Sequence, residues 1–140
     1  MDATALLEAL AAWHPRLAKL GDADAGQVVG SRWTRKELLG HLLDSAVNNH
    51  QRFVRLRQGE LRGFPGYEQD AWVEAGGYRN ASWSQLVSLW HLFNLQLAAV
   101  IREIPEAAAA NRWVDKDVDL AFLVRDYTAH LLHHLERMRA

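Results

Sequence analysis

The segment TRKELLGHLLDSAVNNHQRFVRLRQ, residues 34–58, decides the fold class of this chain. Thr34 and Glu37 stand three residues apart at its start, the spacing of a helix capping box, and Gly59 follows its end as a stop signal. Between these signals, apolar residues recur at helical spacing. The segment therefore predicts one long amphipathic helix, with its apolar positions at Leu38, Leu39, Leu42, Leu43, Ala46, Phe53 and Val54.

Three other segments show the same period. The first covers about residues 6–20, and Pro15 within it predicts a kink or a break. The second begins with a capping-box pattern at Ser82 and ends at Pro105, and the third runs from residue 117 or 119 to near the C-terminus. Four helices of about 18–25 residues, with no strand signal, predict an all-α, antiparallel four-helix bundle.

Length and composition describe an ordinary folded domain. The 140 residues are 49% hydrophobic and 24% charged, so we expect one domain, residues 1–140, with its own core. The net charge of -1 argues against a general nucleic-acid binder, and the start of the chain lacks the basic segment of a secretion signal. No apolar run approaches the ~20 residues of a membrane span. The absence of cysteine excludes disulfides and thiolate ligands and fits a cytoplasmic protein.

A long connection, residues 59–81, holds five of the nine glycines and Pro65. One helical turn is expected around residues 68–74. Long loops in small domains often carry function, so we expect Tyr67 and Glu68 to cover the mouth of a site.

The last helical segment holds three of the seven histidines. His130 and His134 are four residues apart, so one helix face presents both, at a spacing that can hold a metal ion. His133 lies about 60° beyond His130, toward solvent or a rim. The alternative is that the pair is a surface or packing feature. Because two histidines make a poor site, a metal centre needs a third ligand from another helix.

The segment 34–58 offers two candidates for that ligand, His41 and His50, on opposite faces of the helix. His41 shares a polar stripe with Ser45, Asn48 and Arg52, which either lines a pocket or faces solvent. His50 lies in the apolar arc, as a packed or interface histidine or as a ligand, and spacing alone leaves the choice open. The remaining histidines and arginines of note are expected to be structural or surface residues: His14, His91, Arg55, Arg57 and Arg62.

The apolar arc of this helix spans about 180°, whereas a helix that buries one face in its own bundle needs nearer 100°. The excess predicts a second apolar contact, most simply an isologous homodimer with His50 in or near it.

Three motifs occur in order between residues 33 and 134. They are a Trp followed eight residues later by a His-Leu-x-Asp-Ser run, a Pro-x-Tyr loop, and a final H-x-x-H-H. Together they resemble the DinB/YfiT-like family, although Gly40, Ala46 and Arg137 stand where some relatives have further histidines. The residues that carry the resemblance are Trp33, His41 to Ser45, Asn48, Arg52, Phe53, Pro65, Tyr67, Trp72 and His130 to His134.

The resemblance implies a four-helix bundle, commonly a homodimer, with a divalent metal held by His41, His130 and His134. The resemblance thereby selects His41 over His50 as the third ligand. It also implies metal-dependent transfer to or from a low-molecular-weight thiol, or a thiol-dependent isomerisation, although many members have no known reaction.

Three neutral imidazoles leave a metal at least one open position, the pattern of a catalytic site. Zn²⁺ or Ni²⁺ suits them best, and Fe²⁺ is also compatible. The nucleophile would be a water molecule or an external thiol on the metal, and no side chain is assigned as general base. Supporting or substrate-binding roles are expected for Asp44, Ser45, Asn48, Arg52, Tyr67 and Glu68.

The sequence thus predicts a metal-dependent transferase or hydrolase acting on a small molecule, without nucleic-acid or membrane partners. The alternative is a non-catalytic dimeric module that binds a metal or ligand. A purely structural metal is a third reading, and a bundle with this much core should fold without one.

Overall fold

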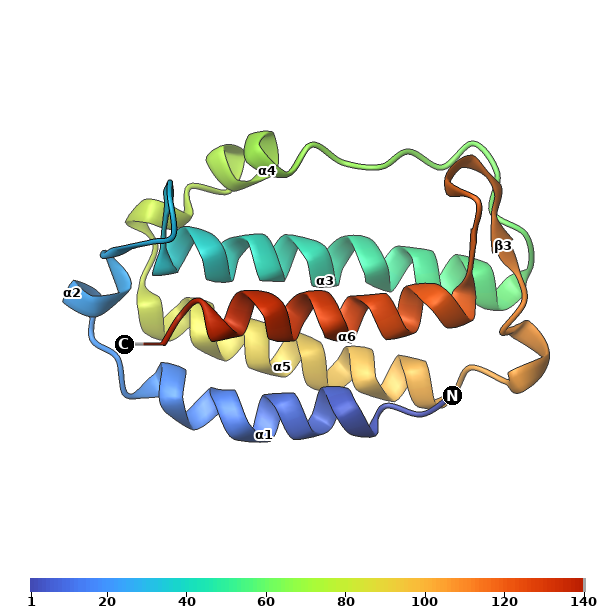
Figure 1. Cartoon of the computed structure of the whole chain (residues 1–140), viewed down its shortest axis with the longest axis horizontal. Helices are drawn as coiled ribbons and strands as arrows, with labels where there is room; N and C mark the ends of the chain where they lie inside the picture. The colour runs from blue at the N-terminus through green and yellow to red at the C-terminus, as the bar shows by residue number, and fades with distance from the viewer. Residues whose placement is uncertain (140) are drawn as a thin grey trace.

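Four long helices lie side by side in the computed structural model, which describes residues 1–139 (Figure 1). The all-α four-helix bundle expected from the sequence is confirmed. Two short helices lie in the connections, and 3₁₀ turns occur at Tyr78–Asn80, Glu106–Ala108 and Val114–Lys116. The helices are α1 (Thr4–Ala18), α2 (Asp22–Ala25), α3 (Arg35–Gln58), α4 (Gln69–Gly76), α5 (Trp83–Arg102) and α6 (Leu120–Glu136).

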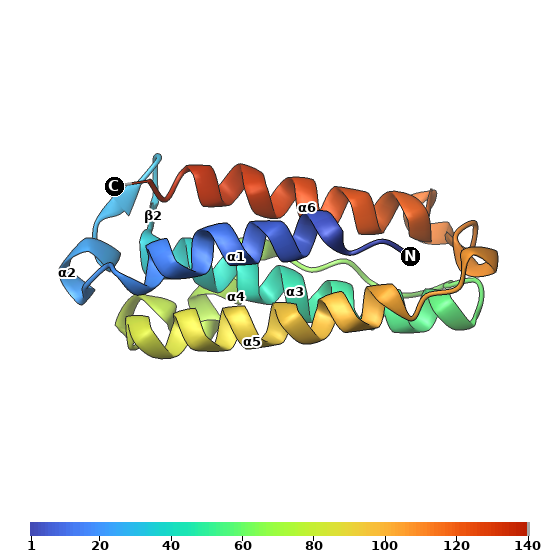
Figure 2. The ribbon, with the colours of Figure 1, turned by 90° about the horizontal axis from the view of Figure 1, so that it is seen from below.

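The long helices form a ring in which α1 contacts α5, α5 contacts α3, α3 contacts α6, and α6 contacts α1. The pairs α1/α5 and α3/α6 are antiparallel, whereas α3 and α5 run in the same direction (Figures 1 and 2). The cause is the connection between α3 and α5, which includes α4 and returns along the length of the bundle (Figure 1). This return places a long loop beside α3 and α6.

Side-chain caps start three of the long helices. The Thr34 hydroxyl accepts a hydrogen bond from the backbone N–H of Glu37, and the Glu37 side chain accepts one from the N–H of Thr34. Ser82 caps α5 and Asp119 caps α6 through their own side chains. The capping patterns in the sequence therefore predict the starts of α3 and α5 correctly.

Of the kink or break expected near Pro15, the break is wrong, because α1 continues through the proline to Ala18. Proline removes one helical hydrogen bond, to the carbonyl of Ala11, but Ala11 and Pro15 are exposed and water can reach that carbonyl. The buried stripe of α1 packs on both sides of the proline and keeps the helix in place: Leu6, Ala9, Leu10, Trp13 and Leu17.

The expectation that the chain contains no strands is also wrong in detail. β1 (Val28–Val29) pairs antiparallel with β2 (Trp33–Thr34), and β3 (Arg112–Trp113) pairs with β4 (Val118–Asp119). Strands of two residues are too short to leave an alternating pattern in the sequence. The first pair positions Trp33 immediately before α3.

By length and composition alone, α5 could cross a membrane. The expectation that no apolar stretch is long enough for a membrane span is therefore wrong for this helix. One side of α5, including Trp90, Leu97 and Ile101, is buried against the other helices. This is the arrangement of a core helix in a bundle. Its outer side nevertheless exposes Leu89, Leu92 and Leu95.

The C-terminal residues are held to the start of α3 by Arg35. This buried guanidinium donates hydrogen bonds to the carbonyls of Met138 at 3.0 Å, Arg139 at 3.2 Å and Asp24 at 2.8 Å, and to the side chain of Gln27 at 2.9 Å. Arg35 is therefore a structural residue whose donors are used within the fold.

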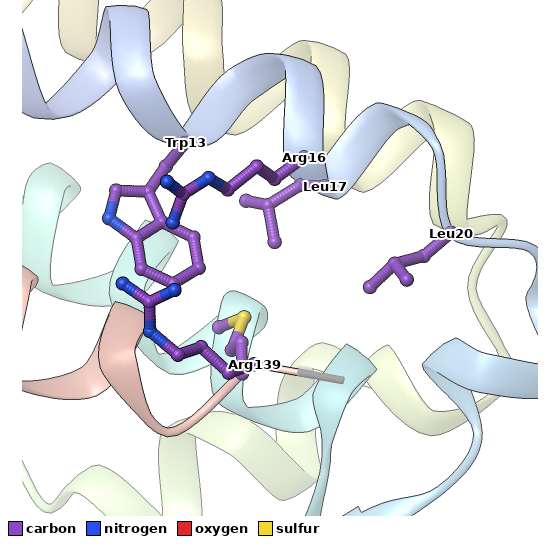
Figure 3. Close-up of a pocket in the computed structure, with 6 residues that line it drawn as sticks. Trp13, Arg16, Leu17, Leu20 and Arg139 are labelled. Carbon is purple, nitrogen blue, oxygen red and sulfur yellow. The ribbon is translucent and has the colours of Figure 1, made fainter.

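A cavity of about 240 Å³ lies between α1 and the C-terminal residues (Figure 3). Arg16 and Arg139 both stack on the ring of Trp13, at 5.0 Å and 5.2 Å. Arg139 also pairs with Glu136. No histidine or carboxylate among residues 1–139 lines this cavity, so it is not the site that the sequence predicts.

Candidate metal centre

Three imidazoles meet between α3 and α6. His41 lies in the second turn of α3, and His130 and His134 lie in the last two turns of α6, which runs antiparallel to α3. The Nε2 atom of His130 is 3.0 Å from Nε2 of His134 and 3.4 Å from Nε2 of His41. One nitrogen from each ring lies within 4.8 Å of the other two. The pairing of the two helices thus brings together residues 89 positions apart in the chain.

The spacing of these nitrogens fits a divalent metal ion. Tetrahedral ligands at 2.0–2.1 Å from zinc lie about 3.3 Å from one another, and the observed separations of 3.0 Å and 3.4 Å fall on either side of that value. Two neutral imidazoles can share only one N–H between facing nitrogens, so the three rings cannot satisfy one another. A cation bound between the three rings would satisfy all three facing nitrogens.

Burial keeps these imidazoles neutral. Desolvation, followed by the charge of His130, lowers the pKa of His41 to about 4. Desolvation, followed by the neighbouring histidines, lowers the pKa of His134 to about 3, and desolvation also lowers the pKa of His130. Because imidazole binds metal only in its neutral form, the site is ready for a cation at neutral pH.

The hairpin of β1 and β2, which precedes α3, packs against one of the three imidazole rings. The indole of Trp33 packs against His41 with ring centroids 5.0 Å apart. Arg32 lies 4.5 Å over Trp33 and pairs with Asp70 of α4 at 2.9 Å. The hairpin and α4 are therefore joined beside His41, which is almost fully buried.

Asp44, one turn after His41, is the buried carboxylate nearest to it in the sequence. One oxygen accepts a hydrogen bond from the hydroxyl of Tyr78 at 2.5 Å, and the other has no hydrogen-bond partner among residues 1–139. Burial raises the pKa of Asp44. Gly40 makes room for the tyrosine, since a Cβ there would lie 2.0 Å from the Tyr78 ring. This contact explains why glycine, not a histidine, stands at this position.

We expect Gly40→Ala to destabilise the protein, although alanine favours a helix by about 1 kcal/mol over glycine. The methyl group would displace the ring of Tyr78 and break its hydrogen bond to Asp44. Gly21→Ala is the control, since nothing lies within 4 Å of its Cβ position. Thermal unfolding should show a clear loss of Tm for the first variant and little change for the second; equal Tm values would contradict the packing described.

Two cavities reach the histidines from opposite sides. One of about 140 Å³ is lined by His130, Ser45, Asn49, Arg52 and Tyr67, together with Leu123, Asp126 and Tyr127. The other, of about 180 Å³, is lined by His134, Trp33, Arg32, Gln69 and Arg137, together with Val29, Ser31 and Leu38. Tyr67 lines the first cavity and Gln69 the second, so the chain passes from one to the other within two residues.

The structure brings some of the other expected site residues to the histidines and leaves others apart. Ser45, Arg52 and Tyr67 line the cavity at His130. Asn48 is buried but donates to the carbonyl of Asp44, within its own helix. Glu68 is exposed and lines neither of the two cavities beside the histidines. Tyr67 therefore lines the site, whereas Glu68 precedes α4 as its N-cap residue.

Several residues at the site were not expected from the sequence. Asn49, Asp126 and Tyr127 line the cavity at His130 and Tyr78 is bonded to Asp44, but none of the four belongs to a motif. Asn49 had one available signal, because it follows His41 by eight residues and Ser45 by four on the same helix.

The remaining histidines do not belong to the group of three, although the ring of His133 lies edge-on to that of His134, with centroids 5.3 Å apart. His133 is exposed, as helix geometry predicts, and His50 packs against Phe93 with ring centroids 5.7 Å apart. His14 and His91 stack on each other across α1 and α5, with ring centroids 3.7 Å apart. Their expected structural or surface role agrees with these positions.

A known structure shares this architecture. YfiT from Bacillus subtilis, described as a probable metal-dependent hydrolase with an unusual four-helix bundle topology, aligns with a TM-score of 0.82. The alignment covers 95% of this chain and 79% of that one. The chain has the fold of YfiT. The resemblance inferred from the sequence motifs is thus supported at the level of the fold.

The sequences of the two proteins are 21% identical, a level at which the YfiT likeness establishes the fold alone. No protein-family model and no curated protein matches the sequence. Any function must therefore be argued from the three imidazoles and the cavities around them.

Proposed function

We propose that this protein is a metal-dependent hydrolase that binds a divalent ion, Zn²⁺ or Ni²⁺, through His41, His130 and His134. The convergence of three neutral imidazole nitrogens without a carboxylate carries the proposal. The description of YfiT as a probable metal-dependent hydrolase agrees with it. When bound, a divalent ion supplies a Lewis acid and lowers the pKa of a water molecule or thiol.

The residues around the histidines have separate roles in this proposal. Trp33 orients His41 by ring packing, and the paired Asp44 and Tyr78 fix the wall of the site beside it. Tyr67 lines the cavity at His130 and limits the access of bulk water to it, which strengthens electrostatic interactions there. Substrate enters through the cavity at His130 or the cavity at His134.

The second candidate is transfer between a low-molecular-weight thiol and an electrophile, which the two cavities favour. Two reactants could approach the same ion from the sides of His130 and His134. Because the chain has no cysteine, the thiol must come from outside. Either activity is proposed for a cytoplasmic protein, in keeping with the absence of cysteine.

The two candidates differ in their need for a thiol. Metal-loaded protein should be assayed on a panel of small esters and amides, with and without an added low-molecular-weight thiol. Turnover without thiol that stops on chelation supports the hydrolase, and turnover that requires the thiol supports the transferase. No turnover in either case, with metal bound, would favour the non-catalytic binding module.

We also propose a homodimer formed through the outer faces of α3 and α5. Leu92 is 64% exposed, and Leu89, Leu95 and Val54 are also exposed on these helices. His50 and Phe93 pack against each other between them. The apolar arc of α3 is buried within the chain except at Val54, so the exposed leucines of α5 support this dimer instead.

Leu92→Glu is expected to convert the dimer into a monomer, because it places a charge in the middle of this apolar face. Phe122→Glu is the matched control, since Phe122 is 44% exposed but lies on α6. Sedimentation velocity at micromolar concentration distinguishes the two states. A parent protein that sediments only as a monomer would refute the dimer.

A further inference from the structure

Arg52 is a buried cation without a counterion. Its side chain is only 9% exposed, and no ion pair joins it to a carboxylate within residues 1–139. Its one hydrogen bond is a long one, 3.5 Å from Nη1 to the side-chain oxygen of Asn49, and its Nε has no partner. Burying a charge in this way is costly unless something pairs with it.

A second buried arginine shows that the fold does not leave the donors of every buried guanidinium without acceptors. Within residues 1–139 Arg35 also has no carboxylate partner, but its guanidinium donates to four acceptors at 2.8 to 3.2 Å. Arg35 therefore serves the structure, whereas most donors of Arg52 remain free. A buried polar group that the fold does not satisfy requires an explanation.

Aromatic rings, instead of acids, hold the Arg52 guanidinium in position. It lies 4.6 Å from the centre of the Trp113 ring and 5.7 Å from that of Tyr67. Trp113 is itself fixed, because it is buried and its indole N–H donates to the carbonyl of Phe64. Stacking on rings orients the planar guanidinium and leaves its edge donors available for a ligand.

Arg52 lines the cavity that reaches His130. Ser45, Asn49 and Arg52 line it from α3, and Ser45 to Arg52 covers about 10 Å along the helix axis. Tyr67 lines the same cavity from the connection between α3 and α4. The acidic residue at this cavity, Asp126, is exposed and forms no ion pair with Arg52.

We propose that this cavity binds a small organic carboxylate, with the carboxylate on Arg52 and the remainder of the molecule directed toward His130. A guanidinium matches a carboxylate with two parallel hydrogen bonds. The volume of about 140 Å³ corresponds to roughly four or five water molecules, which suits a short carboxylic acid. That this acid is part of the substrate rests on the proposed function; its binding to Arg52 does not.

Propionate and propionamide are suitable probes, because they have the same shape and differ in charge. Calorimetric titration of the metal-free full-length protein should show binding of propionate and none of propionamide. Arg52→Gln should weaken propionate binding by roughly 10- to 100-fold. Arg57→Gln, an exposed arginine on the same helix, should bind propionate like the parent. Equal binding of the two probes, no propionate binding by the parent, or unchanged binding by Arg52→Gln would overturn the proposal.

Stability distinguishes a ligand-binding arginine from a structural one. Arg52→Met removes an unpaired buried charge and keeps an apolar stem, so its Tm without ligand should equal or exceed that of the parent. Arg35→Met should lower the Tm strongly, because four acceptors lose their donor. An equally large loss for Arg52→Met would show that Arg52 is structural and would also overturn the proposal.

Failure of this proposal and failure of the proposed function give different results. Arg52-dependent propionate binding without any metal-dependent turnover would leave the carboxylate site standing and refute the enzyme. Turnover by a parent protein that does not bind propionate would support the enzyme and refute the carboxylate site.

Discussion

Replacing His41, His130 or His134 with alanine is expected to reduce Zn²⁺ affinity by several orders of magnitude. Each change removes one of three nitrogens that meet within 4.8 Å. The loss should exceed the roughly 10- to 100-fold cost of removing only a hydrogen bond that supports a ligand. The fold should survive, because the core consists of Leu, Val, Phe and Trp side chains. Calorimetric titration with Zn²⁺ measures the effect, and circular dichroism checks the fold.

His133→Ala is the matched control, because His133 is exposed next to His134 on the same helix. It should bind Zn²⁺ nearly like the parent, as should His50→Ala, which alters only the contact with Phe93. If His133→Ala abolished binding while His130→Ala did not, the orientation of α6 would be wrong. Parent-like binding by all three α6 variants would refute a metal centre on this helix.

Acid is expected to destabilise the metal-free protein well before its carboxylates are protonated. The pKa of His41 falls from 6.5 in the unfolded chain to about 4 in the fold, because burial disfavours the charged ring. Between these values the unfolded state binds the additional proton, so stability is full above pH 6.5 and decreases as the pH falls toward 4. His41 alone should account for a loss of about 3 kcal/mol in the free energy of unfolding.

Urea unfolding at a series of pH values measures this loss. His41→Gln is the control, since it removes the titrating ring and should show a distinctly smaller decrease between neutral and acidic pH. Identical pH profiles for the parent and this variant would show that His41 is not buried as described. Bound Zn²⁺ should raise stability at neutral pH, because only the folded chain holds the three imidazoles together.

The sequence predicted the helices well because their signals are local. Thr34 and Ser82 are caps that act on the next three residues, and Gly59 and Pro105 stop helices by their own backbone chemistry. The four-residue spacing of His130 and His134 is equally local. Spacing could not choose between His41 and His50, however, because that choice depends on which side of α3 faces α6.

The remaining parts of the site depend on contacts between distant segments. Tyr78 reaches Asp44 only because the loop after α4 turns back over Gly40. The burial of Arg52 likewise depends on Trp113, 61 positions later in the chain. Periodicity within one helix contains no information about either contact. The return of the chain along the bundle therefore determines these features. The glycines of residues 59–81 indicate a loop but do not indicate its path.

The metal content of the protein purified without an affinity tag tests the central claim most directly. Elemental analysis should be applied to the parent and to a variant in which His41, His130 and His134 are all alanine. We expect one divalent ion per chain in the parent and only traces in the variant. A parent that carries no metal and takes up none from Zn²⁺ or Ni²⁺ solution, or a variant with the same content, would contradict the metal centre.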